Sequence, residues 1–168
     1  MNADILIEKL GLQPLPGEGG FYRETYRSSE QVPASALADR YGSDKHLGTA
    51  IYYLLTPDTF SAMHRLPTDE VIHFYLGDPV TMIQLHADGT GRTTILGHDV
   101  LKGQVVQCVV PMQVWQGSFL IEGGRFALMG TTMAPGFDFS DLELGDRAKL
   151  VAEYKQYADL IEQLTTEI

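Results

Sequence analysis

Two side chains capable of acid–base chemistry lie six residues apart in the middle of the chain. His64 lies in one short apolar run, and Glu70 begins the next run, seven residues before Gly77. Because side chains alternate between the two faces of a strand, His64 and Glu70 on successive strands can both point inward. An imidazole that titrates near neutrality beside a carboxylate is typical of general acid–base catalysis. We therefore take His64 and Glu70 as candidate catalytic residues.

Both residues also have simpler interpretations. A single strand histidine is more often a packed core or interface residue than a catalyst, and Glu70 could instead pair with Arg65 at a barrel mouth. Alternation places Ala62, Ile72 and Phe74 on the same inward faces. A mostly apolar surface with a few converging polar groups suits a small-molecule pocket, so Phe74 is a candidate ligand-binding residue.

The elements that must position these side chains are short β runs separated by turn signals. The expected strands are Ala50–Leu55, Ser61–Leu66, Val71–Leu76, Val80–His86, Arg92–Leu96, Val105–Val110 and Phe126–Thr132. A spacing of roughly 8 to 12 residues from one strand to the next is typical of an antiparallel sandwich or barrel. It is not typical of alternating βαβ units. The sequence therefore predicts an all-β fold.

Other elements are expected at both ends of the chain. The apolar residues between Asp4 and Gly11 predict a short helix, with Asp4 as its N-cap, and Phe21 to Arg27 alternates as a strand does. Residues 29–46 are expected to form a long loop with one helical turn around Ala34 to Arg40. From Asp146 to Leu164, apolar residues at intervals of three and four predict one helix. We expect a single domain over 1–168, with an N-terminal helix and strand at 3–28, a barrel core at 49–132, and a connector and helix at 133–168.

Composition argues against several classes of function. The 168 residues carry 12 Lys plus Arg and 22 Asp plus Glu, a formal charge of -10, which repels nucleic acid. The longest strictly apolar run, Ala50 to Leu55, is far shorter than the roughly 20 residues that a transmembrane helix needs. With one cysteine, Cys108, and no signal peptide, we expect a cytoplasmic protein. We expect its partner to be a small molecule, and neither nucleic acid nor membrane.

The stretch around His64 resembles the first signature of the cupin superfamily, in which two histidines and a glutamate ligate a metal. His64, Glu70 and Gly77 are in register with it, and Gly103 and Pro111 resemble the second signature. The resemblance implies a double-stranded β-helix, the cupin jelly-roll barrel, with the terminal helices packed outside.

The metal ligands implied by this resemblance are incomplete. Leu66 occupies the position of the second histidine ligand of the first signature, and Gln116 occupies the position of the histidine ligand of the second signature. The ligand set that remains is His64, Glu70 and Gln116. First-row metals are normally held by at least three imidazole or carboxylate ligands, and His73 should point to the face opposite Glu70. We expect no tightly bound cofactor; a divalent metal on this reduced set is the alternative.

From Leu6 to about Leu150 the chain also resembles a narrower branch, the cupin 5 or DUF985 family. The phrases that carry this resemblance are Leu10-Gly-Leu, Glu18 to Arg27, Ala50 to Leu55, His64 to Tyr75 and Ala134 to Glu143. It implies a homodimer, structural similarity to sugar-nucleotide 3,5-epimerases, and no assigned reaction. Those epimerases use an inward histidine as base and a tyrosine as acid, which suggests His64 as base and leaves Tyr22, Tyr53 and Tyr75 open as acid.

The candidate ligand-binding residues are Tyr22, Arg23, Tyr53, Phe74, Trp115 and Gln116. Arg23 follows two glycines whose amides could cradle an anion, although a tight turn explains the glycines equally well. Trp115 and Gln116 could equally be packing residues. We expect a barrel that binds a small polar or sugar-like molecule, with isomerase or epimerase chemistry at His64. The alternatives are a metal-dependent oxygenase or isomerase, and a binding or sensor module without catalysis.

Overall fold

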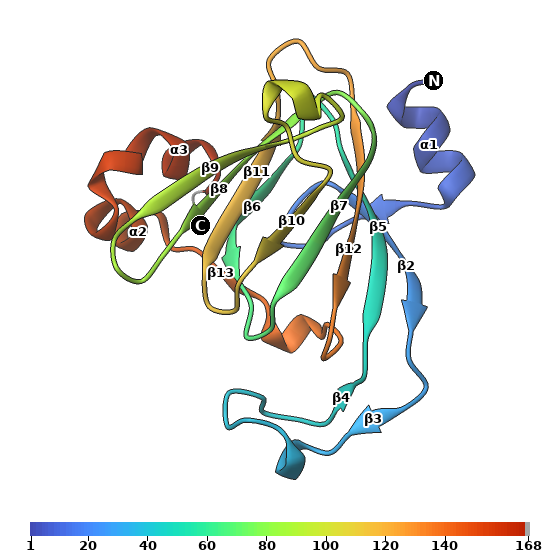
Figure 1. Cartoon of the computed structure of the whole chain (residues 1–168), viewed down its shortest axis with the longest axis vertical. Coiled ribbons are helices and arrows are strands. Elements are labelled where there is room, and N and C mark those ends of the chain that lie inside the picture. The colour runs from blue at the N-terminus through green and yellow to red at the C-terminus, as the bar shows by residue number, and fades with distance from the viewer. Residues whose placement is uncertain (167–168) are drawn as a thin grey trace.

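Two antiparallel β-sheets face each other as a jelly-roll barrel in the computed structural model, which describes residues 1–166 (Figure 1). The first sheet contains, in spatial order, β1 (Gln13–Pro14), β2 (Phe21–Arg27), β5 (Thr49–Leu55), β12 (Ala127–Met133), β7 (Glu70–Gly77) and β10 (Gln107–Val110). The second contains β13 (Glu143–Leu144), β6 (Phe60–Arg65), β11 (Trp115–Leu120), β8 (Val80–Leu85) and β9 (Gly91–Leu96). The predicted all-β fold is confirmed.

Inward side chains of both sheets form the barrel core. Tyr53, Phe74 and Met129 of the first sheet pack with Met82 and Leu96 of the second. Each large apolar side chain buried in this way contributes about 1.5–3 kcal/mol. Toward the end of the barrel where β7 begins, this apolar layer gives way to polar side chains.

Helices cover the outer faces of both sheets (Figure 1). On the first sheet, α1 (Ala3–Leu10) packs Leu6 with Leu54 and Leu128. On the second, α2 (Arg147–Glu153) and α3 (Ala158–Gln163) pack Leu150 and Ile161 with strand residues that include Ile83. No helix within residues 1–166 is both long and apolar enough to cross a membrane.

Two helical predictions are wrong in detail. The single helix predicted over 146–164 is interrupted at Tyr154, where φ is -118 and ψ is 55, and a 3₁₀ turn, η4 (Lys155–Tyr157), precedes α3. Because a spacing of three fits a 3₁₀ turn as well as an α-helix, the apolar pattern did not reveal the break. The N-cap of α1 is Asn2 and not Asp4, since Asn2 Oδ1 accepts a hydrogen bond from the Ile5 amide.

The strand β11 was not predicted from the sequence. Its residues Gln116, Gly117 and Ser118 have little of the β-branched or aromatic character that favours strands. The strand nevertheless pairs with β6 on one side and β8 on the other. A Cβ at Gly117 would lie 2.8 Å from Met63 Sδ, so the absence of a side chain allows this close approach.

An arm and a connector lie at the polar end of the barrel. The arm comprises residues 28–48 and includes the stretch 29–46, which was predicted as a loop with one helical turn. It contains a 3₁₀ turn, η1 (Ala34–Ala36), where the helical turn was expected, and a small pairing of β3 (Gln31–Val32) with β4 (Lys45–His46), which was not expected. The connector, residues 134–142, contains η3 (Phe139–Asp141) and follows Met133, which pairs with Glu70. The remaining 3₁₀ turn of the described residues, η2 (Val100–Lys102), lies between β9 and β10. Lys45 Nζ lies 2.7 Å from Asp141 Oδ2 and joins the arm to the connector.

Candidate functional site

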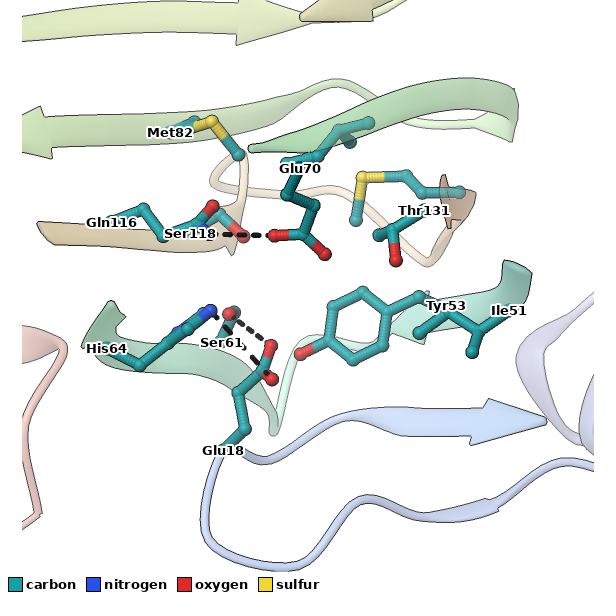
Figure 2. A pocket seen from close by; sticks show the side chains of 12 residues that line it. Glu18, Ile51, Tyr53, Ser61, His64, Glu70, Met82, Gln116, Ser118 and Thr131 are labelled. Atoms are coloured by element: carbon teal, nitrogen blue, oxygen red, sulfur yellow. Dashed lines mark hydrogen bonds and ion pairs between the residues drawn. The ribbon is translucent and has the colours of Figure 1, made fainter. Parts of the chain in front are cut away.

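The polar end of the barrel contains a small cavity, which we call the inner chamber. Its volume is about 30 Å³, and since a buried water needs about 10–15 Å³, it has room for about two groups the size of water. Both sheets and the turn before β2 line it (Figure 2). The polar side chains with most bearing on its chemistry are Glu18, Tyr53, Ser61, His64, Glu70 and Gln116.

His64 is held in a single orientation on β6. The side chain is buried, and its Nδ1 lies 2.7 Å from the carbonyl oxygen of Ala62. A carbonyl oxygen only accepts hydrogen bonds, so Nδ1 carries the hydrogen and, in the neutral ring, Nε2 carries the lone pair. Nε2 lies 4.0 Å from Glu18 Oε2. The arrangement presents His64 Nε2 as a base next to a carboxylate.

Glu18 reaches the inner chamber because the chain turns sharply after it. Gly19 and Gly20 have φ values of 96 and 69, in the region that favours glycine. A Cβ on Gly19 would lie 2.5 Å from the carbonyl oxygen of Phe60, so this turn tolerates no side chain. Ser61 Oγ donates to Glu18 Oε1 at 2.7 Å and fixes the carboxylate beside His64.

Glu70 lies across the inner chamber from His64, at the start of β7 in the opposite sheet (Figure 2). Gln116 Nε2 donates to Glu70 Oε2 at 2.7 Å. Burial raises the pKa of Glu70, and nearby Glu18 adds to the rise while His64 opposes it. Compared with an exposed glutamate, Glu70 therefore favours its neutral acid form. Because their environments differ in this way, His64 and Glu70 can act as base and acid in one reaction.

Tyr53 remains a neutral hydroxyl group in this environment. Burial raises its pKa well above the usual range, with a further contribution from the charge of Glu18. Its hydroxyl donates to the carbonyl oxygen of Gly19 at 2.9 Å, which supports the turn that positions Glu18.

A larger cavity, which we call the outer chamber, adjoins the inner chamber. Its volume is about 260 Å³, and it shares Glu18 and Glu70 with the inner chamber as lining residues. Tyr22, Phe137 and Phe139 line it with aromatic rings. The ring of Phe139 meets Phe137 edge to face at 5.1 Å and Tyr22 at 6.3 Å.

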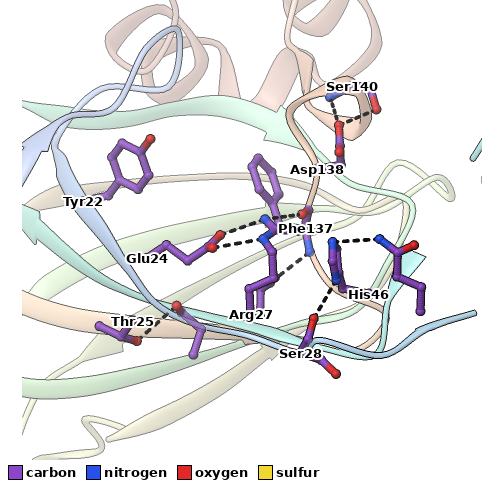
Figure 3. Close-up of polar contacts among 12 residues, drawn as sticks. Tyr22, Glu24, Thr25, Arg27, Ser28, His46, Phe137, Asp138 and Ser140 are labelled. Atoms are coloured by element: carbon purple, nitrogen blue, oxygen red, sulfur yellow. Dashed lines mark hydrogen bonds and ion pairs between the residues drawn. The ribbon is translucent and has the colours of Figure 1, made fainter. Parts of the chain in front are cut away.

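Two charged side chains in the wall of the outer chamber, Arg27 and Glu24, bind each other. Arg27 donates to Glu24 Oε2 at 2.7 Å and to the carbonyl oxygen of Phe137 at 3.0 Å (Figure 3). The same contact links β2 to the connector. The Arg27 guanidinium is therefore already compensated by a carboxylate.

The donor set of the inner chamber does not fit a tightly held transition metal. Within residues 1–166, no group of three or more His, Cys, Asp or Glu side chains is arranged to hold a metal ion. Leu66, which stands where the resemblance implies a histidine, lines the outer chamber and offers no ligand atom. Gln116 donates its amide hydrogen to Glu70. The acids and bases of the chain itself are therefore the groups available for chemistry in this chamber.

The structure brings together some of the candidates named from the sequence and separates others. His64, Glu70, Tyr53 and Gln116 line the inner chamber, and Tyr22 lines the outer one. Three candidates lie elsewhere: Arg23, Phe74 and Trp115.

Each of the three has a different partner. Arg23 is exposed and lies 5.5 Å from the ring of Tyr52. Phe74 points inward, but it packs in the apolar core and meets the ring of His98 at 4.9 Å. Trp115 packs outside the second sheet among the residues under α2 and α3, with the Arg65 guanidinium 4.5 Å from its ring.

Sequence reasoning missed Glu18 as a site residue, and it missed both phenylalanines of the outer chamber. The signal for Glu18 was the pair Gly19-Gly20, since a turn with two positive φ values brings the preceding side chain back toward the barrel. Phe137 and Phe139 lie in a connector without regular pattern, so nothing local marked them.

These features define the class of the protein: a jelly-roll barrel with an inward histidine and glutamate at one end is a cupin. Residues 4–145 match the family described as Cupin superfamily (DUF985), and the chain belongs to that family. The predicted family and barrel are confirmed.

The relatives agree with this assignment. The uncharacterized protein YML079W of Saccharomyces cerevisiae is 30% identical over 132 residues, which are 74% of this chain and 66% of the yeast protein, slightly under two thirds of its length. A hypothetical protein from Leishmania major is 31% identical with a TM-score of 0.89, over 99% of this chain and 100% of that one. Protein SO0799 from Shewanella oneidensis is 34% identical with a TM-score of 0.88, over 100% of this chain and 99% of that one. None of these names states an activity or a ligand.

Proposed function

We propose that the barrel binds a small polar, sugar-like molecule and exchanges a proton with it, as isomerases and epimerases do. The observation that carries the proposal is the fixed orientation of His64, whose Nε2 faces the inner chamber while Nδ1 is bonded to Ala62. Glu18 lies beside this base, and Glu70 lies on the other side of the inner chamber.

In the proposed reaction, His64 Nε2 removes a proton from a carbon next to a carbonyl group. The electron pair of the broken C–H bond forms the double bond of an enediol, while Glu70 in its acid form donates a proton to the carbonyl oxygen. If a proton then returns to the neighbouring carbon, loss of the enediol hydroxyl proton gives the isomer. If it returns to the opposite face of the same carbon, loss of the enediol hydroxyl proton gives the epimer. The raised pKa of Glu70 supports its role as the acid, and Glu18 stabilises the imidazolium that forms.

The size of the two chambers supports a ligand of monosaccharide size. Ligand sites usually measure about 300–1,000 Å³, and the outer chamber of about 260 Å³ with its small inner extension is at the lower limit. A nucleotide sugar would extend beyond these two chambers. Aromatic rings in the outer chamber can pack against the apolar face of a sugar ring.

Deuterium exchange tests the proposal directly. The protein is incubated in D₂O with a panel of neutral aldoses and ketoses and with 2-amino aldoses, and NMR follows deuterium at the carbon next to the carbonyl. The wild type is expected to catalyse exchange and His64→Ala to lose it. His73→Ala is the matched control, because His73 pairs with Thr132 and Gln107 outside both chambers. A panel without exchange above the protein-free rate contradicts the proposed reaction.

Binding without turnover is a second candidate, favoured by one observation. Both carboxylates of the inner chamber already accept hydrogen bonds, Glu18 from Ser61 and Glu70 from Gln116, as in a preformed binding site. A ligand whose affinity falls in His64→Ala, and which shows no exchange with the wild type, supports this candidate over the first.

A further inference from the structure

The inner chamber has an excess of negative charge. Glu18 and Glu70 both line it, with Glu70 buried and the Glu18 side chain 15% exposed. Of the described residues that line this chamber, none is Lys or Arg, and His64 is its single ionisable nitrogen base. Even with Glu70 in its neutral acid form, the Glu18 carboxylate is withdrawn from water beside one imidazole and lacks a full complement of positive charge.

The cations near the site cannot supply the missing charge. Arg27 is paired with Glu24 at 2.7 Å. Lys45 is paired with Asp141. Arg65 is paired with Glu143 at 2.7 Å and lies over the Trp115 ring, outside the chambers.

The inner chamber also offers more hydrogen-bond acceptors than donors. Each carboxyl group has two oxygens with two lone pairs each, and the hydrogen bonds from Ser61 to Glu18 and from Gln116 to Glu70 use only part of this capacity. The hydroxyl of Tyr53 is directed to the Gly19 carbonyl, so it does not serve a ligand. A group that brings several donors and a positive charge is the best complement to this surface.

We propose that the ligand carries a primary amine, bound as ammonium in the inner chamber between Glu18 and Glu70, with its ring in the outer chamber. The inference rests on the proposed function and names its substrate class: small amines of amino-sugar type without phosphate. The volume of about 30 Å³ admits an ammonium and one further small group. A phosphate, with four oxygens and negative charge, is excluded from this chamber by size and by repulsion from the Glu18 carboxylate.

The amine class fits the proposed chemistry. In a 2-amino aldose, the carbon that bears the amine is also the carbon next to the carbonyl. An ammonium that donates to the Glu18 carboxylate and to the carbonyl oxygen of protonated Glu70 places that carbon next to His64 Nε2. The carbonyl oxygen of the sugar takes the second position in the inner chamber, where the Glu70 hydroxyl can donate to it.

Three probes that differ only at C2 test the inference: glucose with a hydroxyl, glucosamine with an amine, and N-acetylglucosamine with a neutral amide. Binding is measured by calorimetry below the pKa of the amine. Glucosamine is expected to bind at least about tenfold more tightly than glucose, equivalent to about 1.4 kcal/mol. N-acetylglucosamine, which is bulkier and uncharged, is expected to bind no better than glucose.

Variants assign the preference to the inner chamber. Glu18→Gln, which removes the charge, and Glu70→Leu, which removes the acceptor on the other side of the chamber, are each expected to reduce the ratio of glucosamine to glucose affinity several-fold. Glu122→Gln, an exposed carboxylate in the turn after β11, is the matched control and should keep the wild-type ratio. If either chamber variant fails to fold, the ratio of glucosamine to glucose affinity in the wild type and in the other variant still tests the amine inference.

The outcomes separate the two proposals. Equal affinities for glucosamine and glucose, or a ratio unchanged in both chamber variants, overturn the amine inference and leave sugar binding intact. Failure of all three probes to bind the wild type overturns both.

Discussion

Removal of one charge from the Lys45–Asp141 pair should destabilise the protein strongly. The Lys45 side chain is 2% exposed and that of Asp141 is 9% exposed, and Lys45 Nζ contacts both carboxylate oxygens at 2.7 and 2.8 Å. In Asp141→Asn, the buried ammonium loses its compensating charge. Removal of one partner from a buried ion pair costs about 3–5 kcal/mol, a large share of the roughly 5–15 kcal/mol that stabilises a typical domain.

Urea unfolding at neutral pH measures this cost, and the chain offers a matched control. Glu143→Gln makes the same carboxylate-to-amide change in the Arg65–Glu143 pair, whose side chains are 33% and 54% exposed. Exposed pairs contribute about 0–1 kcal/mol, so the control should unfold at nearly the wild-type urea concentration. The double variant Lys45→Met with Asp141→Leu should recover most of the lost stability, because it leaves no unpaired buried charge.

The same pair should affect ligand binding from a distance. Asp141 ends η3, and Phe139 in the same turn lines the outer chamber. Asp141→Asn should therefore also weaken glucosamine binding, although it touches neither chamber. If Asp141→Asn loses no more free energy of unfolding than Glu143→Gln does, the reasoning is refuted, since burial of the Lys45–Asp141 pair would then have no energetic consequence.

Three further predictions concern the chambers. Because the pKa of Glu70 is raised in the folded state, its contribution to stability is complete below the ordinary value of 4.5 and is lost as pH rises through the folded-state pKa. Glu70→Gln should therefore gain stability relative to wild type as pH rises above 4.5 in urea unfolding, and a difference independent of pH contradicts this. Gly19→Ala should cost about 2 kcal/mol or more, since φ of 96 and the Phe60 carbonyl both oppose a Cβ; thermal unfolding within error of wild type would count against it. Phe139→Ala should weaken sugar binding several-fold in calorimetry with little loss of stability, because the residue is 50% exposed; unchanged affinity would remove it from the site.

Strand alternation was the part of the site that local sequence could predict. It placed His64 and Glu70 inward, and both line the inner chamber. Alternation also implies that consecutive residues of a strand face opposite ways. Trp115 and Gln116 are such neighbours, and only Gln116 lines the chamber.

The other features depend on contacts between segments distant in sequence. Arg23 follows Tyr22 on β2 and takes the outer face, so only Tyr22 reaches a chamber. Phe74 has the predicted inward direction, but its place along β7 puts it in the apolar core. Periodicity gives the face of a strand, and it does not give the depth along the barrel at which a cavity lies.

Glu18 could not be assigned from periodicity, because it belongs to a turn. Its position depends on the Phe60 carbonyl, Ser61 and Tyr53, each more than 30 residues away in the chain. The strand β11 likewise forms because β6 and β8 flank it and not because its own residues favour it. Tertiary packing decides such elements where local propensity is weak.

A crystal structure of the protein with glucosamine bound tests the central claim most directly. We expect density for the sugar across both chambers, with the amine within hydrogen-bond distance of Glu18 and Glu70 and the ring against Phe139. Density for the sugar only outside the barrel, or empty chambers at a glucosamine concentration that saturates binding in solution, would contradict it.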